Sequence, residues 1–398
     1  MPMLAVGHRR TGACPTFDRP VQQRDGYLLR VPLVGGTVTP VQANAIAEVA
    51  STMGNGVVEL TNRGNLQLRG LRPETLGPAQ ERLRSLGLGD PRAALVTISP
   101  FAGPVEHALR ARVVDALGPI AGDASLSPKF VVHIDDASAT TSSRRAEVTL
   151  RSTGDTWRVE IPLVGWCDVT ADDAVRTVVA LAEACRSFGD EARVGDVLDA
   201  CGPGWLHAVL PVELGPTSSA AAATRTMPRP GDLLALAGGP AVVVAARFGR
   251  VDSEQLGSLA ALGLDLTVTP WRSFLVPCPS DVEAPRPPVD RLARIGLIVD
   301  PADPAADVVT CIGAAGCWQT EADTLVEAER VVALRASGAA VAGPIKAGGE
   351  SDTSTGTIHV TGCDKRCATR GPVATTFIGR TDGSGFDEVA SRARATFT

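Results

Sequence analysis

The sequence predicts an α+β fold made of two pseudo-symmetric halves. The chain has 398 residues, more than one hydrophobic core usually organises, so at least two domains or a duplicated unit are expected. A series of strand, helix, strand and strand patterns also occurs twice in the same order. The predicted strands are rich in β-branched residues, and the predicted helices carry apolar residues at spacings of three and four. Together these observations favour a duplication over a chance similarity between α/β segments.

The first copy of the series lies near the N-terminus and the second follows the middle of the chain. The first copy has a strand at 27–33, a helix at 39–53 and strands at 57–61 and 66–71. The second copy has a strand at 241–247, a helix at 252–263 and strands at 264–269 and 273–277.

The segments that follow the two copies also correspond. Residues 94–103 resemble residues 307–316, and residues 129–136 resemble residues 357–365. We expect the join between the halves in the loop 215–231, where Pro, Ser, Gly and a run of Ala interrupt any periodic pattern.

Composition indicates an ordinary globular protein. Hydrophobic residues make up 44% of the chain, charged residues 21%, and the net charge is -6, whereas a nucleic-acid binder would present a basic surface. The N-terminal apolar stretch is too short for a signal sequence, and the apolar segment 230–249 contains Asp232 and Arg247. We therefore expect a cytoplasmic protein that binds neither nucleic acid nor membrane.

Two cysteine pairs are the most specific chemical signal. Cys311 and Cys317 have five residues between them, and Cys363 and Cys367 have three. In a reducing compartment, an odd total of nine cysteines argues for metal ligation or buried thiols over disulfides. The five-residue gap is wide for zinc, but an iron–sulfur cluster on four thiolates accepts it, and the small residues 313–316 leave room for its sulfides. We expect a [4Fe-4S] cluster, with structural zinc or unrelated buried thiols as the alternatives.

This cysteine spacing and the two-half organisation resemble the sirohaem sulfite and nitrite reductase superfamily. The resemblance implies a ferredoxin-like strand-helix-strand unit followed by a nitrite/sulfite reductase-type α/β domain in each half. It places the first ferredoxin-like half-domain at 20–88, the first α/β domain with substrate-side basic residues at 89–200, the second ferredoxin-like half-domain at 201–300, and the second α/β domain with the cluster at 301–398.

The same resemblance implies roles for single residues. Cys367 is at the position that can bridge the cluster to a macrocycle iron, and Arg63, in "ELTNRGNLQLRG", is at the position that faces the substrate anion. The segment "LSPKF" resembles one in which two lysines, separated by a Phe, reach that anion. Lys129 is the first of these, but Val131 replaces the second, so support for sulfite or nitrite reduction is weakened.

Four stretches narrow the resemblance to the precorrin-3B synthase branch of this superfamily. They are "RRTGACPTFDRP" at 9–20, "TPWR" at 269–272, "CIGAAGCWQTEADT" at 311–324 and "HVTGCDKRCA" at 359–368. This resemblance implies the hydroxylation of precorrin-3A by dioxygen at the meso carbon between rings A and D, with the ring A acetate closing to a γ-lactone. It also implies a cleft between the halves that holds the tetrapyrrole, and a cluster that delivers electrons.

The resemblance further implies a non-haem iron, whose ligands the sequence does not identify. A facial triad needs two His and a carboxylate, and His133 is the only histidine with acidic neighbours. Strand alternation places Asp135 on the same face as His133 and Asp136 on the other, while His359 occupies the matching place in the second half. No dinucleotide-binding motif is present, so electrons that derive ultimately from NADH would need an external reductase.

Binding a macrocycle fringed with carboxylates requires local cations in a chain of negative net charge. Arginine suits this task because its planar guanidinium binds a carboxylate through two hydrogen bonds. Arg63 and Lys129 are the expected catalytic cations, and Lys129 stands out because lysine is rare in this chain. The expected substrate-binding cations are Arg69, Arg92 and Arg272.

Two other functions remain open at this point. A sirohaem-dependent nitrite or sulfite reductase would use the same cysteines and Arg63, with sirohaem as an additional cofactor. A non-catalytic protein with a structural four-cysteine metal site is the more remote alternative.

Overall fold

The computed structural model describes residues 15–121, 126–137, 146–162, 164–189, 192–215, 228–278, 289–338, 357–368, 375–380 and 383–390. Most of the predicted join at 215–231, namely residues 216–227, and the first half of the stretch at 9–20, namely residues 9–14, lie outside these residues.

Two five-stranded antiparallel sheets form the centre of the molecule, and each takes one strand from the other half of the chain. The first sheet has the order β1 (Val21–Gln23), β2 (Gly26–Val31), β5 (Leu66–Leu71), β4 (Val57–Leu60) and β13 (Arg250–Asp252). The second has the order β11 (Leu233–Leu236), β12 (Gly239–Ala245), β15 (Ser273–Pro277), β14 (Leu266–Val268) and β3 (Thr37–Val38). Strands β13 and β3 are therefore exchanged between the halves.

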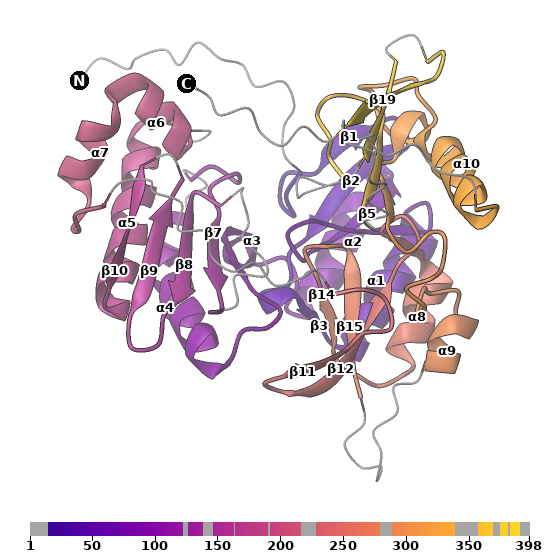
Figure 1. Ribbon diagram of the computed structural model, residues 1–398, viewed down its shortest axis with the longest axis horizontal. Helices are drawn as coiled ribbons and strands as arrows, with labels where there is room; N and C mark the ends of the chain where they lie inside the picture. The colour runs from indigo at the N-terminus through magenta and orange to yellow at the C-terminus, as the bar shows by residue number, and fades with distance from the viewer. Residues whose placement is uncertain are drawn as a thin grey trace, which may run out of the picture.

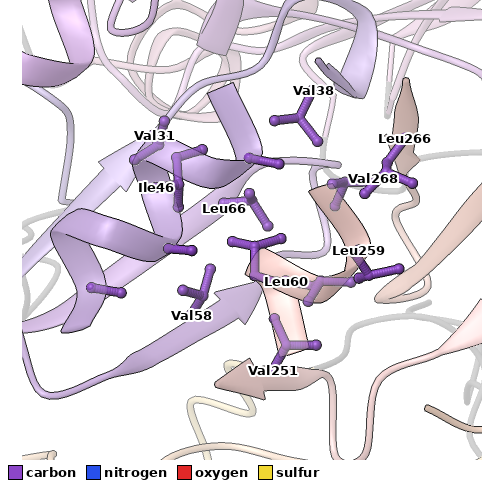
Figure 2. Packing of buried hydrophobic residues seen from close by; sticks show 14 of the residues in the cluster. Val31, Val38, Ile46, Val58, Leu60, Leu66, Val251, Leu259, Leu266 and Val268 are labelled. Carbon is purple, nitrogen blue, oxygen red and sulfur yellow. The ribbon is translucent and has the colours of Figure 1, made fainter. Parts of the chain in front are cut away.

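Helices from both halves pack on these sheets around one hydrophobic core. They are α1 (Pro40–Met53), α2 (Pro73–Arg84), α8 (Ser253–Ala260) and α9 (Val289–Arg294). Helix α1 begins with Thr39, whose side chain and backbone form a capping box with Gln42. Figure 2 shows Ile46 of α1, Leu60 of β4 and Leu259 of α8 in the same cluster. The exchanged strands contribute Val38 and Val251 to it, so the two halves share a core.

The other two sheets repeat one pattern of strand directions. In the first, β6 (Val96–Ile98), β7 (Val132–Asp135) and β8 (Val148–Ser152) are parallel neighbours, and β9 (Trp157–Ile161) and β10 (Gly165–Val169) follow antiparallel. In the second, β16 (Val308–Thr310), β17 (Ile358–Thr361) and β18 (Thr375–Gly379) are parallel and β19 (Phe386–Ala390) is antiparallel.

Helices α3 (Pro91–Leu95), α4 (Pro104–Ala121), α5 (Ala171–Ser187), α6 (Val194–Cys201) and α7 (Pro203–Val209) belong to the β6–β10 sheet, whereas α10 (Thr324–Ala336) packs on the β16–β19 sheet. There are two short 3-10 helices: η1 (Val34–Gly36) precedes β3, and η2 (Gly313–Ala315) precedes Cys317. The β7–β10 sheet and its helices form a body beside the central sheets, and α10 lies at the opposite edge of the view (Figure 1). No helix in the described part of the chain is long and apolar enough to cross a bilayer.

The predicted fold class is confirmed. The predicted strands and helices of both copies are present, with boundaries that differ by at most three residues. The strand exchange was not predicted, because strands of two or three residues are too short to show an alternating pattern.

Candidate metal centre and the adjoining cavity

The fourth sheet brings the two cysteine pairs to one edge. Cys311 follows β16 and Cys363 comes two residues after β17, and these strands are parallel neighbours, so their carboxyl ends meet. The backbone N–H of Gly362 donates to the Cys311 Sγ at 3.3 Å. The charges of Cys311 and Cys317 both act on the thiols of Cys363 and Cys367. The four predicted ligands are thus neighbours in space.

Glycine is required at two places in the loop between Cys311 and Cys317. Gly313 has a φ of 61°, and a Cβ there would lie 2.5 Å from the Thr324 Oγ1. A Cβ on Gly316 would lie 2.6 Å from the Arg69 Nη2. The Thr324 hydroxyl donates to the Cys311 carbonyl at 2.7 Å, which ties the loop to the first turn of α10. Close approach of protein atoms therefore explains the two glycines.

The thiols have an environment that suits bound thiolates. Burial and the neighbouring thiolates raise the pKa of Cys363, and burial raises the pKa of Cys367 to about 12, so both thiols stay protonated until a metal displaces the protons. Backbone N–H groups donate to the Cys311 Sγ and, from Gln319 at 3.4 Å, to the Cys317 Sγ. Donors of this kind stabilise negative charge on sulfur, and metal binding supplies the positive charge that deprotonates the thiols. The four cysteines fit a thiolate-bound cluster.

A single metal ion fits less well. Within the described ranges, no three His, Cys, Asp or Glu side chains are close enough together to bind one ion. A zinc ion needs all four ligands about 2.3 Å from one centre, whereas the four irons of a cluster each take one thiolate and hold them farther apart.

Residues from the start of the chain hold the cysteine loop. The Gly316 carbonyl accepts from the Arg24 N–H at 3.2 Å and from the Arg69 Nη2 at 3.0 Å. Arg24 also donates to the Ala314 carbonyl at 3.2 Å. Arg69 is buried and forms ion pairs with Asp25 at 2.8 Å and Glu59 at 3.3 Å. Sequence reasoning missed Arg24, Asp25 and Glu59, since no local pattern distinguishes them from surface charges.

Arg272 is buried as well. Its Nε donates to the Leu60 carbonyl at 2.6 Å, its Nη1 to the Thr310 carbonyl at 3.0 Å and its Nη2 to the Gly249 carbonyl at 3.2 Å. The contacts of Arg69 and Arg272 therefore lie inside the protein, beside the cysteine loops and away from open surface. Their expected contact with a substrate carboxylate stays a prediction.

Arg63 and Lys129 lie near each other at a cavity between the halves. The Arg63 Nη1 donates to the carbonyl of Pro128, the residue before Lys129, at 3.2 Å. Arg63 lines a small cavity, with about 10 Å³ of interior space, together with η1 and parts of α3, β6 and the segment that contains Val268 and Pro270. The cavity thus borders the first half-domain, the β6–β10 sheet and the second half.

Arg92 and Val131 have different surroundings. Arg92 forms an exposed ion pair with Asp90 at 2.9 Å. Its contact with substrate stays a prediction. Val131, at the position of the missing lysine, is buried, and its carbonyl accepts from the Glu147 N–H at 2.7 Å.

The two strand histidines are both buried but have different partners. The His133 Nδ1 lies 3.0 Å from the Thr97 hydroxyl, and its Nε2 lies 3.9 Å from the Asp135 carboxylate. The shared face of His133 and Asp135 is thus observed, but no third ligand joins them among the described residues, and they do not make a facial triad. Neither ring nitrogen of His359 has a hydrogen-bond partner in the described part of the chain.

Comparison with known proteins agrees with this architecture. Residues 20–86 match the nitrite/sulfite reductase ferredoxin-like half domain family. The chain is 27% identical to the precorrin-3B synthase of Sinorhizobium sp over 406 residues, which covers 96% of this chain and 83% of that protein. It is 36% identical to the ferredoxin–nitrite reductase of Leptolyngbya laminosa over 93 residues, covering 22% of this chain and 18% of the relative.

A solved structure extends the comparison to the whole fold. The structure of the Mycobacterium tuberculosis NirA protein superposes with a TM-score of 0.69 at 18% identity, covering 91% of this chain and 73% of that chain. The resemblance to precorrin-3B synthase, within the nitrite and sulfite reductase superfamily, is therefore confirmed.

Proposed function

We propose, from a resemblance to precorrin-3B synthase that spans nearly the whole chain, that this protein converts precorrin-3A to precorrin-3B in aerobic cobalamin biosynthesis. One atom of dioxygen enters the macrocycle as a hydroxyl group and the other leaves as water, which consumes two electrons and two protons. The ring A acetate then closes to the γ-lactone. This similarity is the observation that supports the proposal most strongly.

Cys311, Cys317, Cys363 and Cys367 would hold a [4Fe-4S] cluster. The cluster, when bound, would supply electrons that an external reductase delivers, ultimately from NADH. The chain's own residues keep the site in shape: backbone N–H groups stabilise two of the thiolates, and Arg24 and Arg69 hold the loop between the first cysteine pair.

The tetrapyrrole would bind between the halves, beside Arg63 and Lys129. The cavity there has only about 10 Å³ of interior space, far below the roughly 300 to 1,000 Å³ of small-molecule sites, so the macrocycle would lie along the surface that adjoins it. Arg63 would orient a substrate carboxylate, and Lys129 would add positive charge. The buried Val131 stands where the resemblance places the second lysine of the anion reductases, so this cation is missing here.

Anaerobic reconstitution followed by turnover tests the proposal. The chemically reduced protein is given precorrin-3A with dioxygen, and separately sulfite and nitrite. We expect oxygen consumption with formation of precorrin-3B and negligible reduction of either anion. Efficient six-electron reduction of sulfite or nitrite without precorrin turnover would reverse the assignment.

The ligand set has its own test. Separate Ala replacements of Cys311, Cys317, Cys363 and Cys367 should each lower the content below about four irons and four sulfides per chain. Cys201, which is exposed and isolated from the four, is the matched control and should tolerate the same replacement. Full cluster content in all four variants would show that other residues bind the iron.

A sirohaem-dependent nitrite or sulfite reductase is the second candidate. The local similarity to a ferredoxin–nitrite reductase and the place of Arg63 support it. The absorption spectrum of anaerobically purified protein separates the possibilities: sirohaem bands favour the reductase, broad cluster absorption alone favours the synthase, and a colourless zinc protein favours a structural metal site.

A further inference from the structure

Arg272 occupies a turn whose counterpart in the first half is closed by glycine. In both turns a threonine N–H donates to the carbonyl four residues later, at 2.8 Å from Thr61 and 2.9 Å from Thr269. The fourth residue of each turn is left-handed, with a φ of 65° at Gly64 and 63° at Arg272. An arginine loses about 1 to 2 kcal/mol in this conformation relative to its usual one. Such an outlier, held by surrounding structure, points to a function of the side chain.

The guanidinium of Arg272 connects three segments of the chain. It donates to carbonyls at the end of β4, before β13 and at the end of β16, the residue just before Cys311. Gly249 makes room for it, since a Cβ on Gly249 would lie 2.4 Å from the Arg272 Nε. The side chain is thus packed between both central sheets and the first cysteine of the candidate centre.

The charge of Arg272 is only partly balanced by a carboxylate. Among the described residues it has no ion pair of its own: Glu59, whose charge acts on it, is paired with Arg69 and Arg250, and Asp25 is paired with Arg69. These five side chains carry three positive and two negative charges. Burial lowers the pKa of Arg272 to about 10, which leaves it protonated at neutral pH. An unbalanced buried charge is costly, so an anionic group nearby is expected.

The anionic groups that act on Arg272 are Glu59, which Arg69 and Arg250 already pair, and then Cys311 and Cys367. Four thiolates around a cluster give that group a net negative charge. We infer that Arg272 is a positioning residue that supplies the buried positive counter-charge of the cluster and fixes the strand end that carries Cys311. This inference rests on the proposed cluster on the four cysteines.

A cation beside a cluster stabilises the reduced form, which carries one more negative charge, and therefore raises the reduction potential. The test compares Arg272→Gly, which places the turn residue of the first half here, with Arg272→Lys, which keeps the charge. Arg247→Ala is the control, since Arg247 is an exposed arginine paired with Glu329. Iron and sulfide content and a redox titration are measured on each reconstituted protein.

We expect Arg272→Gly to lower the reduction equilibrium constant about tenfold, which is about 59 mV for one electron. Arg272→Lys should keep most of the parental potential, and Arg247→Ala all of it. A parental potential in Arg272→Gly with full cluster content would overturn the inference.

If Arg272→Gly loses its cluster, the iron and sulfide content of Arg272→Lys shows whether the charge of the side chain is what the cluster needs. Full iron and sulfide content in Arg272→Lys supports a role of the charge, because lysine cannot bridge three carbonyls as arginine does. Loss of the cluster from Arg272→Lys to the same extent as from Arg272→Gly overturns that role. Absence of a cluster from the parental protein is a separate result, which contradicts the proposed function itself.

Discussion

Arg63 is the arginine whose surroundings best suit contact with substrate. It lines the cavity between the halves, whereas Arg69 and Arg272 are enclosed beside the cysteine loops. A charge-assisted hydrogen bond to a carboxylate contributes roughly 1.5 to 3 kcal/mol. We therefore predict that Arg63→Ala weakens precorrin-3A binding roughly tenfold to a hundredfold with cluster content unchanged.

The control for this prediction is an arginine in the same half-domain. Arg82 forms an exposed ion pair with Glu48 at 3.1 Å, and such pairs contribute about 0 to 1 kcal/mol. Binding measured by fluorescence or absorption titration should be unaffected in Arg82→Ala. Parental affinity in Arg63→Ala would contradict the placement of the tetrapyrrole at this cavity.

The two buried histidines predict a loss of stability in mild acid. Burial, followed by the charge of Arg151, lowers the pKa of His133 from 6.5 to about 4, and burial and the charges of Arg272 and Arg366 do the same for His359. Above pH 6.5 both folded and unfolded forms are neutral, so the effect is absent. Between pH 6.5 and 4 the unfolded chain binds protons that the folded protein excludes, so stability falls.

Each histidine contributes on the order of 3 kcal/mol to this loss by pH 4. Urea unfolding midpoints measured from pH 7 to pH 4 should decrease, and His133→Gln should show a shallower decrease than the parental protein. An identical pH profile for parent and variant would show that His133 is accessible to protons in the folded state.

At the scale of single elements, the loop between the first cysteine pair depends on Gly316. A Cβ there would lie 2.6 Å from the Arg69 Nη2 and 2.8 Å from the Asp25 Oδ2, and this ion pair is buried and cannot easily move. Overpacking of this kind costs about 1 to 3 kcal/mol. We predict that Gly316→Ala lowers the thermal midpoint and the retention of iron after desalting.

Gly195 offers a matched control for this substitution. It lies in α6, and a Cβ there would meet no atom within 4 Å. Alanine is favoured over glycine in helices, so Gly195→Ala should be neutral or slightly stabilising. Equal iron retention in both variants would show that the loop relaxes around the added methyl group.

The longest predicted elements show a clear period, whereas short strands such as β14, with three residues, were predicted from their place in the repeated series. Helix α1 and strands β2, β5 and β12 each span six residues or more, and their alternation or helical spacing was visible. Strands β3 and β13 have two and three residues, and their partners lie in the other half of the chain. Pairing across such a distance leaves no local trace in the sequence.

The sequence also predicted only part of the candidate site, namely its cysteines but not the surroundings of its arginines. The cysteine spacing identified the four candidate ligands, and the topology brings them together as parallel strand ends. The environment of Arg69 and Arg272 could not be predicted, because alternation along a strand gives the face on which a side chain lies but does not show what covers that face.

At the scale of the whole molecule, the exchanged strands predict that the halves stay together when the chain is cut. Strand β13 pairs with β4, β3 pairs with β14, and residues of both halves form one hydrophobic core. A protease site inserted between Gly215 and Pro228 should yield two fragments that co-elute on gel filtration without denaturant. The uncut protein with the same insertion is the control, and separate elution of the fragments would contradict the shared core.

The hydrogen bonds from Arg24 and Arg69 to the cysteine loop also bear on the order in which parts of the chain fold during synthesis. These arginines are made first, and they contact a loop 247 to 290 residues later in the chain. Domains begin to fold as they leave the ribosome, N-terminal segments first. Because the first sheet takes β13 from the second half and Glu59 pairs with Arg250, these contacts form only after both halves have been made. The iron and sulfide of the proposed cluster would therefore enter a chain that is already largely folded.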